Sequence, residues 1–481
     1  MDADLDPMDW AATRAQAHRM LDDILDHVQG VGEGPVWTPM PDEVRSALAG
    51  PLPWEPGTLE AAHGDFQRLV LPYSVGNLHP RFMGWVHGGG NVPGMLAEML
   101  AAGLNANLGG RDHAPVEVER QVVRWMAELF GFPDGASGLF VTGTSTANLI
   151  AVLAARAAAL GAESRIHGVG EAGAGLTAYA SAAAHGCVAK ALDMAGLGSG
   201  ALRAIPVLAD GGLDPEQLAE AVAADRAAGL DPFLIVGTAG TVDTGAVDDL
   251  EALAHIAARE RLWLHVDGAF GALAKLSPEL APLLAGIERA DSIAFDFHKW
   301  GQAPYDAGFV LMRDEARHRA AFASQAAYLE RGSRGLAAGA PWPCDYGPDL
   351  SRGFRALKVW FAFKTHGADA IGAAIAKTCR LARVLGARVD AEPELERLAP
   401  VPLNIVCFRF KGPNPLKNDA LNTEIVVRLQ ESGLAAPSTT TLHGRVCIRA
   451  AIVNHRTRRE DIHVLTDEVL RLGRALSGDF A

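Results

Sequence analysis

Basic residues are scarce in this sequence of 481 residues. It contains 43 Lys and Arg against 57 Asp and Glu, which gives a formal net charge of −14. Proteins that bind nucleic acids need basic surfaces to contact phosphates, so this balance argues against nucleic acid as the main partner. The excess of negative charge favours solubility instead.

Cysteines are also few, and no pair of them has the CxxC spacing. Their odd number and wide scatter predict thiols in a reducing compartment, without a disulfide framework. The same spacing gives no reason to expect a zinc site or any other metal site. The five are Cys187, Cys344, Cys379, Cys407 and Cys447.

Long apolar runs are missing as well. No run reaches the roughly 18 residues that a membrane helix needs, and the nearest candidate, Leu149–Leu160, contains Arg156. Residues 1–30 are acidic and amphipathic, without the basic and apolar regions of a signal peptide. We therefore expect a cytoplasmic protein that does not contact membranes.

The composition that remains is that of a globular protein, with 49% hydrophobic and 21% charged residues. Strand and helix patterns alternate regularly through the middle of the chain. This alternation predicts an α/β fold with a mostly parallel sheet and helices on both faces. The predicted strands are 138–143, 177–180, 203–207, 233–238, 263–267 and 292–297; the predicted helices are 146–160, 185–197, 215–228 and 249–259.

The two ends of the chain have other patterns. Residues 8–28 have the spacing of an amphipathic helix and precede a proline-rich segment, which is typical of an arm on a partner subunit or of a linker. After residue 346 the chain becomes helical and then gives strands at 405–410 and 445–451 around a helix at 422–432. This end predicts a smaller α+β domain.

Two neighbouring predicted strands end in groups that suit one cofactor. The stretch Asp291–Trp300 ends in His298 and Lys299, and the upstream stretch Leu262–Phe270 has Asp267 where its apolar segment ends. An amine and a carboxylate at the carboxyl ends of parallel strands could hold an aldehyde cofactor as a Schiff base, with the acid facing a protonated ring nitrogen. A salt-bridged strand end without chemistry is the alternative.

Two further segments complete this set. Thr142–Asn148 joins a strand to a helix with glycine and hydroxyls, which suits a phosphate, although a plain helix cap by Thr144 or Ser145 would look the same. It lacks the Walker lysine and the GxGxxG pattern, which disfavours nucleotide folds. His185 opens a helix after a strand, where it could stack on a planar ring or be an interior histidine. Together these parts are the ones that pyridoxal phosphate requires.

The chain resembles the group II pyridoxal-phosphate decarboxylases, which include the aromatic-L-amino-acid, histidine, glutamate and cysteine sulfinate enzymes. The likeness extends firmly from Pro72 onward and loosely over the amino-terminal arm. The segments that carry it are His265–Phe270, Asp296–Trp300, Gly143–Asn148, His185, Leu350–Lys358 and Arg449.

This resemblance implies a homodimer of fold type I among the pyridoxal-phosphate-dependent transferases. The implied domains are an amino-terminal helical arm swapped onto the partner (1–78), a large cofactor-binding α/β domain (79–364) and a small α+β domain (365–481). It implies that Lys299 holds pyridoxal 5'-phosphate, that Asp267 pairs with the ring nitrogen and that His185 stacks on the ring. The remaining cofactor contacts that it implies are Thr144, Ser145 and His298 at the phosphate, Ala269 under the ring, and Asp296.

The resemblance also implies decarboxylation of an L-amino acid to an amine and CO2. Trp85, Val86 and His87 would line the side-chain pocket, and Arg111 and His113 lie near where the family's pocket continues. Arg449 is a further candidate for the pocket. Arg111 could bind an acidic side chain of the substrate, or it could form an ion pair with Asp112. We slightly favour an aromatic substrate over an acidic one.

The chain departs from the family at the proton donor. The position of the family's catalytic loop tyrosine falls on Pro343, so Tyr346 could serve only if the loop is shortened. Gly353 stands where a second arginine is usual. Loss of that tyrosine is associated in the family with oxidative deamination to an aldehyde, which is therefore an alternative outcome. A non-catalytic homologue of the same fold is another.

Overall fold

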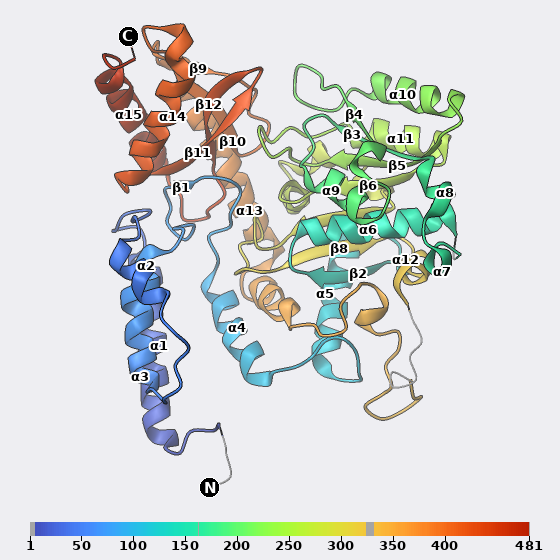
Figure 1. The fold of residues 1–481 in the computed structure, drawn as a ribbon, viewed down its shortest axis with the longest axis horizontal. Helices are drawn as coiled ribbons and strands as arrows, with labels where there is room; N and C mark the ends of the chain where they lie inside the picture. Colours follow the sequence, from blue (N-terminus) through green and yellow to red (C-terminus); the bar gives the residue numbers. More distant parts are fainter. Residues whose placement is uncertain (1–4, 162, 324–330, 481) are drawn as a thin grey trace.

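The computed structural model describes residues 5–161, 163–323 and 331–480. Two β-sheets organise these residues, one of seven strands and one of five (Figure 1). Helices pack against both, and the α/β fold class predicted from the alternation of elements is confirmed. No helix within the described ranges combines the length and the apolar character that a membrane span requires.

The seven-stranded sheet is almost entirely parallel. Its strands, in spatial order, are β2 (Ser137–Val141), β8 (Gly308–Met312), β7 (Ser292–Asp296), β6 (Trp263–Asp267), β5 (Asp231–Thr238), β3 (Leu176–Ser181) and β4 (Leu202–Ile205). Only β8 runs against its neighbours. Strands buried on both faces are expected to be continuous apolar runs, and every residue of β6, β7 and β8 is buried. The strand β8 was not predicted from the sequence.

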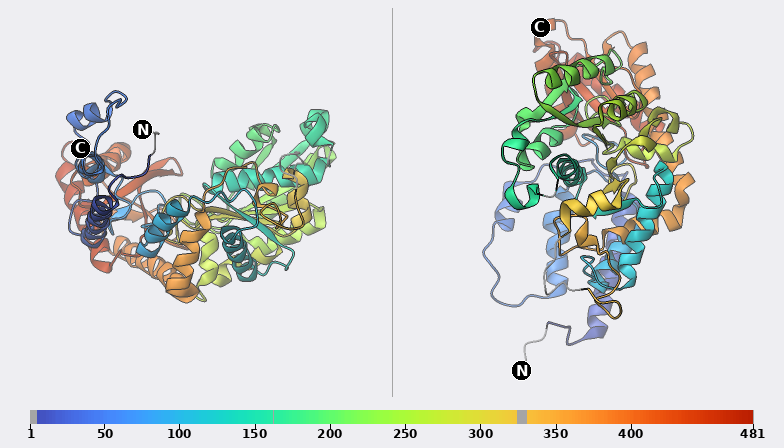
Figure 2. Two further views of the ribbon diagram at one scale, coloured as in Figure 1. Left: turned by 90° about the horizontal axis from the view of Figure 1, so that it is seen from below. Right: turned by 90° about the vertical axis from the view of Figure 1, so that its right-hand side faces the viewer.

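Helices cover both faces of this sheet (Figures 1 and 2). On one face lie α6 (Thr144–Leu160) and α9 (Cys187–Met194), and α6 packs closely because its sheet-facing positions are mostly alanine. The other face is covered by α5 (Ala114–Phe130), α10 (Pro215–Ala227) and α11 (Leu250–Glu260). The remaining helices of this region are α4 (Val92–Leu104), α7 (Ser164–His167), α8 (Gly170–Ala174) and α12 (Glu315–Phe322).

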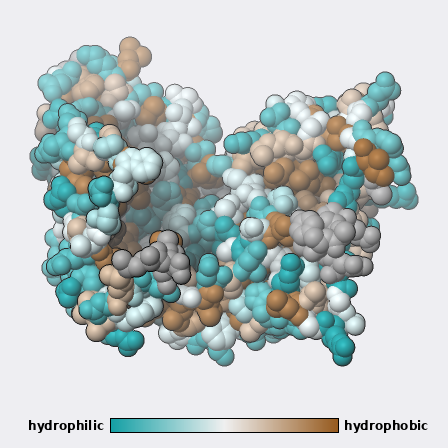
Figure 3. Space-filling model, turned by 60° about the horizontal axis from the view of Figure 1, so that its bottom comes forward, coloured by the Kyte–Doolittle hydropathy of each residue, from teal (hydrophilic) through white to brown (hydrophobic). Residues whose placement is uncertain are grey.

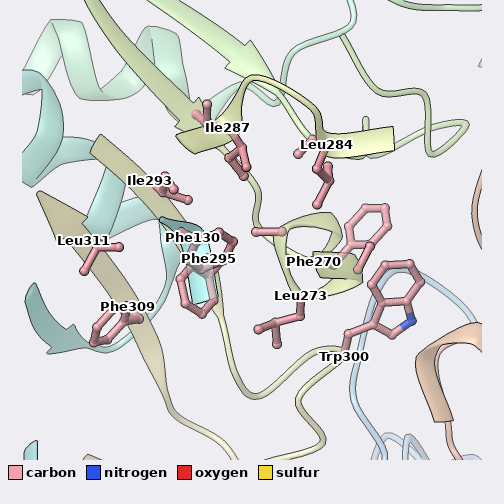
Figure 4. Packing of buried hydrophobic residues seen from close by; sticks show 14 of the residues in the cluster. Phe130, Phe270, Leu273, Leu284, Ile287, Ile293, Phe295, Trp300, Phe309 and Leu311 are labelled. Atoms are coloured by element: carbon pink, nitrogen blue, oxygen red, sulfur yellow. The ribbon is translucent and has the colours of Figure 1, made fainter. Parts of the chain in front are cut away.

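Large aromatic side chains fill the core on the second face (Figure 4). Phe295 of β7 lies 5.5 Å from Phe130 and 5.3 Å from Phe309 between ring centroids. Trp300 is buried and meets Phe270 edge to face at 5.3 Å. Because Trp300 directly follows Lys299, this packing fixes the backbone that carries the lysine.

The five-stranded sheet belongs mainly to the carboxyl-terminal part of the chain. Its order is β1 (Phe82–Met83), β11 (Ala436–Leu442), β12 (Arg445–Ala451), β10 (Ile405–Phe410) and β9 (Leu395–Arg397). The helices α14 (Asn418–Glu431) and α15 (Arg459–Leu476) pack against it. The edge strand β1 comes from before the large sheet in sequence and pairs in parallel with β11.

The long helix α13 (Arg355–Ala391) connects the two sheets. At Gly367 its backbone leaves the helical region, with φ 77° and ψ 157°. Glycine is the residue that adopts such a positive φ without strain, so the helix bends there. The predicted domain boundary between residues 364 and 365 lies close to this bend and remains a prediction.

The amino-terminal helices stand beside the rest of the molecule (Figures 1 and 2). They are α1 (Trp10–Gly30), α2 (Asp42–Leu48) and α3 (Leu59–Asp65). Gln16 is the one buried residue of α1, and Trp10 and Trp54 keep 62% and 86% of their surface exposed. Figure 3 shows the surface hollowed between the side that carries these helices and the side that carries the large sheet.

Candidate active site

A cavity of about 410 Å³ opens at the carboxyl ends of the parallel strands of the large sheet. This edge is where open α/β sheets bind ligands. A larger cavity of about 1050 Å³ lies at the opposite edge, but none of the predicted cofactor residues lines it. The smaller cavity is lined by Trp85, Val86, His87, Thr142, Gly143, Thr144, Ser145, His185, Cys187, Thr238, Gly240, Val242, Asp267, Ala269, Phe270, Asp296, His298, Lys299 and Tyr305.

Lys299 lies just after the end of β7, and its amine points into this cavity. Its Nζ atom is 2.9 Å from Oδ2 of Asp296, the last residue of the strand. The other oxygen of Asp296 accepts the backbone N–H of Thr144, the first residue of α6, at 2.7 Å. Asp296 therefore holds the lysine against the amino terminus of α6.

Asp267 ends β6 and is buried in the cavity wall. Its carboxylate accepts hydrogen bonds from the side chain of Asn148 at 2.9 Å and from the backbone N–H of Ala269 at 3.1 Å. Burial raises the pKa of Asp267, and the hydrogen bond from Asn148 and the charge of Lys299 oppose that shift. A cationic group at this carboxylate would complete the compensation of the buried charge.

His298 is held in one orientation by its neighbours. Its Nδ1 accepts the backbone N–H of Ala307 at 3.0 Å, and its Nε2 is 3.5 Å from Oδ2 of Asp296. Burial lowers its pKa to about 4, so the ring is neutral near pH 7 and its proton lies on Nε2. Ring centroids of His298 and Tyr305 are 4.2 Å apart.

Tyr305 lines the cavity and was not identified from the sequence. The backbone N–H of Gly88 donates to its hydroxyl, and burial raises the pKa of the phenol. Gly88 itself allows this contact, because a Cβ atom there would lie 2.3 Å from the carbonyl oxygen of His298. A tyrosine six residues after the lysine has no periodic signature, so only the folded chain reveals it.

His185 lies at the mouth of the same cavity, just before α9. Its Nδ1 accepts the backbone N–H of Cys187 at 3.1 Å. In the neutral ring the proton is therefore on Nε2. The strand β3 and the start of α9 bring this imidazole to the edge that also carries Asp267 and Lys299.

The cavity wall fits the cofactor that the sequence predicts. The hydroxyls of Thr144 and Thr238 are buried in the wall, and neither has a hydrogen-bond partner among the described residues. Buried hydroxyls without partners are uncommon and suit polar atoms of a ligand. The amino terminus of α6, with Ser145, suits a phosphate, while Asp267 and Lys299 suit a ring nitrogen and an aldehyde.

The outer wall of the cavity is aromatic. His87 stacks on Phe82 at 5.7 Å and on Trp85 at 5.9 Å, and it meets Tyr305 edge to face at 5.8 Å. Burial and the nearby charge of Lys299 lower the pKa of His87. Trp85, Val86 and His87 thus form one side of the cavity, and their place in a side-chain pocket for the substrate stays a prediction.

Three basic residues that the sequence assigned to the pocket lie elsewhere in this chain. The guanidinium of Arg111 stacks on Trp342 at 4.6 Å, and Nε2 of His113 is 3.2 Å from the carbonyl of Gly110. Arg449 is buried behind the wall and donates to the carbonyls of Trp85 and Val242. None of the three lines the cavity.

Tyr346 also lies away from the cavity. Its hydroxyl donates to Oε1 of Glu315 at 2.6 Å, and its ring lies 5.1 Å from that of His318. Burial and the carboxylate of Glu315 raise the pKa of Tyr346. The packing of this loop against α12 turns the phenol away from Lys299, which a count along the sequence could not reveal.

The buried His318 beside Tyr346 gives a testable pH dependence. Burial lowers its pKa to about 3, whereas an unfolded histidine titrates near about 6.5. Below pH 6.5 the unfolded chain therefore binds a proton at this histidine that the folded protein does not bind. The free energy of unfolding of the wild type consequently decreases as the pH is lowered below 6.5. The difference in unfolding free energy between wild type and His318→Gln is expected to narrow by roughly 1.4 kcal/mol per pH unit below pH 6.5. Urea unfolding at several pH values checks this; a constant difference would contradict it.

Comparisons with known proteins agree with this geometry. The family described as the pyridoxal-dependent decarboxylase conserved domain matches residues 41–411. The aromatic-L-amino-acid decarboxylase of Bacillus atrophaeus is 31% identical over 96% of this chain and 96% of its own length. The phenylacetaldehyde synthase of Arabidopsis thaliana is 30% identical over 93% of each.

A solved structure is similar over nearly the whole chain. The crystal structure of Oryza sativa TDC with PLP and tryptamine superposes with a TM-score of 0.90 at 26% identity, covering 98% of this chain and 100% of the other. The family match spans most of the sequence, and the cavity carries the groups that such a cofactor needs. The chain therefore belongs to the pyridoxal-dependent decarboxylase family and is a lyase that works with pyridoxal 5'-phosphate.

Proposed function

We propose that this enzyme removes the α-carboxyl group of an aromatic L-amino acid and releases the amine and CO2. The observation that carries the proposal is the composition of the cavity wall. Lys299, the one lysine or arginine among the described lining residues, faces a wall built from Trp85, His87 and Tyr305. An aromatic side chain finds stacking partners there, and a carboxylate side chain finds no second cation.

Lys299 is the proposed attachment point for the cofactor. When bound, pyridoxal phosphate supplies an aldehyde that captures amines and a ring that accepts the electron pair left by CO2. The amine of Lys299 would hold that aldehyde. Asp296, 2.9 Å away, would orient the amine by accepting a hydrogen bond from it. A substrate amine would displace it within the same cavity.

Asp267 would hold a proton on the ring nitrogen. Its carboxylate is buried and already receives neutral hydrogen bonds from Asn148, from the backbone of Ala269 and, at 3.8 Å, from the thiol of Cys187. An ionised carboxylate in that position stabilises a protonated nitrogen, and the protonated nitrogen makes the ring a better electron acceptor. This role needs Asp267 to remain charged despite its burial.

The other wall residues would fix the cofactor's orientation. His185 would lie against one face of the ring, and Ala269 would leave room under the other. The phosphate would lie at the start of α6, where the backbone N–H of Ser145, the hydroxyls of Thr144 and Ser145 and the Nε2–H of His298 can donate.

The substrate preference is supported by where the basic residues lie. Arg111 is stacked on Trp342, and Arg449 donates to two backbone carbonyls. Within this chain neither guanidinium is directed at the cavity, which disfavours an acidic substrate. A panel of L-amino acids is expected to show CO2 release from tryptophan, tyrosine or phenylalanine at least about tenfold faster, in kcat/KM, than from glutamate or aspartate. Faster release from the acidic amino acids would overturn the preference.

A second outcome is favoured by Tyr346. Its hydroxyl is bound to Glu315 and the family's tyrosine position holds Pro343, so residues 331–346, the part of this loop that the structure describes, place no proton donor at the cavity. The alternative reaction consumes the amino acid, O2 and water and yields an aldehyde, CO2, ammonia and hydrogen peroxide. Equal amounts of peroxide and CO2 in the same panel would establish this outcome; CO2 and amine without peroxide would exclude it.

We further propose that the enzyme is a cytoplasmic homodimer whose amino-terminal arm packs on the partner. The arm presents large apolar side chains to solvent, among them Trp10 and Trp54, and α1 buries only Gln16. Light scattering is expected to give twice the chain mass of 50.7 kDa, and removal of residues 1–57 is expected to give monomers. A monomeric full-length protein would contradict the proposal. The five free cysteines fit a reducing compartment.

A further inference from the structure

A chain of buried hydrogen bonds leads from Asp267 into the interior of the large domain. The side-chain amide of Asn148 donates to Asp267 at 2.9 Å, and its oxygen is 2.8 Å from Nε2 of His265. Nδ1 of His265 is 2.8 Å from the hydroxyl of Ser292, which in turn accepts the indole N–H of Trp263 at 2.8 Å. All five side chains are buried.

The chemistry of these groups fixes the direction of every bond. Indole can only donate, and a carboxylate can only accept. Asn148 gives its N–H to Asp267, so its oxygen must receive a proton, and Nε2 of His265 is the donor. Burial lowers the pKa of His265 to about 3, so the ring is neutral and Nδ1 accepts from Ser292. Every donor therefore points toward Asp267.

We propose that Asn148, His265 and Ser292 form a relay whose purpose is to keep Asp267 ionised, and that His265 is a positioning residue for the cofactor. The proposal rests on the proposed pairing of Asp267 with the ring nitrogen. A row of aligned hydrogen bonds polarises each member, so the last N–H, on Asn148, becomes a stronger donor to the carboxylate. His265 acts through Asn148 and does not touch the cavity.

The relay answers an electrostatic need of this site. Burial favours the neutral acid at Asp267, which could not hold a proton on the ring nitrogen. The groups that face Asp267 from the packed elements are Lys299, His185 and Cys187. Burial raises the pKa of Cys187 to about 12, so this thiol is neutral, and Lys299 is committed to Asp296. The relay supplies a fixed, uncharged stabilisation that does not depend on the state of the lysine.

Three substitutions and one control test the relay. His265→Phe keeps the ring volume and removes the donor, and Asn148→Leu breaks the chain at a second point. His265→Gln keeps one donor and one acceptor and is expected to keep the ring nitrogen of the cofactor protonated. His318→Phe is the matched control, because His318 is equally buried and bonds to Ser137 at 2.8 Å away from the cavity.

The readout is the protonation state of the cofactor's ring nitrogen. It is measured from the 15N chemical shift of ring-labelled pyridoxal phosphate bound to each protein. Wild type, His265→Gln and His318→Phe are expected to hold a protonated nitrogen at neutral pH. His265→Phe and Asn148→Leu are expected to hold an unprotonated or mixed population and to bind the cofactor about tenfold more weakly. A protonated ring with wild-type affinity in His265→Phe would overturn the relay. An unprotonated ring in wild type would instead overturn the proposed role of Asp267.

The tautomer gives a test that needs no cofactor. In 15N-histidine-labelled apoenzyme, the signals lost in His265→Gln are expected to be those of a ring protonated on Nε2. They are expected not to titrate between about pH 5.5 and 8.5, where free histidine does. A ring protonated on Nδ1 would reverse the bond direction and overturn the relay.

Discussion

Lys299→Ala is expected to lose at least about 10⁴-fold in kcat, because the residue that would hold the cofactor and hand it to the substrate is gone. The same variant is also expected to differ from the wild type in its absorbance spectrum. Pyridoxal phosphate gains a near-visible absorbance band when a protein amine captures its aldehyde, and the variant should lack that band after reconstitution. Lys299 faces the cavity with its Nζ atom beside Asp296, so this band should depend on this lysine alone.

Lys190→Ala is the matched control for this experiment. Lys190 is an exposed lysine of α9 and does not line the cavity. The control is expected to keep both the band and the turnover. An unchanged band in Lys299→Ala would assign the attachment to another amine, and the proposed roles of the surrounding residues would fall with it.

Arg352→Met is expected to lower the unfolding free energy by about 3–5 kcal/mol, the usual cost of leaving a buried partner charge unpaired. Arg352 and Glu119 are both buried, with contacts at 2.5 and 3.2 Å. The same guanidinium donates to the carbonyls of Leu108 and Phe140. Removing it therefore leaves the buried carboxylate of Glu119 without a counter-charge, with only the backbone N–H of Phe140 as a donor at 3.2 Å, and takes one donor from each of two carbonyls.

Denaturant unfolding of a small set of variants checks this prediction. Adding Glu119→Leu to Arg352→Met is expected to recover much of the lost stability, because the second substitution removes the unpaired charge. Arg380→Ala is the surface control: its partner Glu279 is solvent-exposed, and the change should be small. If Arg352→Met and Arg380→Ala behaved alike, the buried pair would not be what stabilises this region.

The large sheet was predictable because its strands are buried on both faces. Such strands are apolar runs between turn residues, and six of the seven were found from the sequence, one of them (263–267) with the observed bounds and the other five with shifted ends. The strand Gly308–Met312 was missed, although it is equally apolar, because it breaks the regular strand–helix alternation. Phe82–Met83 could not be found at all, since two residues carry no periodicity.

The candidate site was predictable where it depends on strand ends. Lys299, Asp267 and His185 follow predicted strands, and the carboxyl ends of parallel strands meet at one edge. Tyr346 and Arg449 show where this reasoning stops. Each lies near the correct part of the chain, but Glu315 and the carbonyl of Val242, both distant in sequence, decide where the side chains point.

The pairing of β1 with β11 has a consequence for how the chain folds during synthesis. Phe82 leaves the ribosome early, and its partner Ala436 is made only when most of the chain has emerged. The large sheet can close in the meantime, since domains fold as units during translation. Trp85, Val86 and His87 follow β1 after Gly84, so this wall of the cavity is finished last. A nascent chain that stops before β11 would already hold Lys299 and Asp267 but would lack a completed pocket.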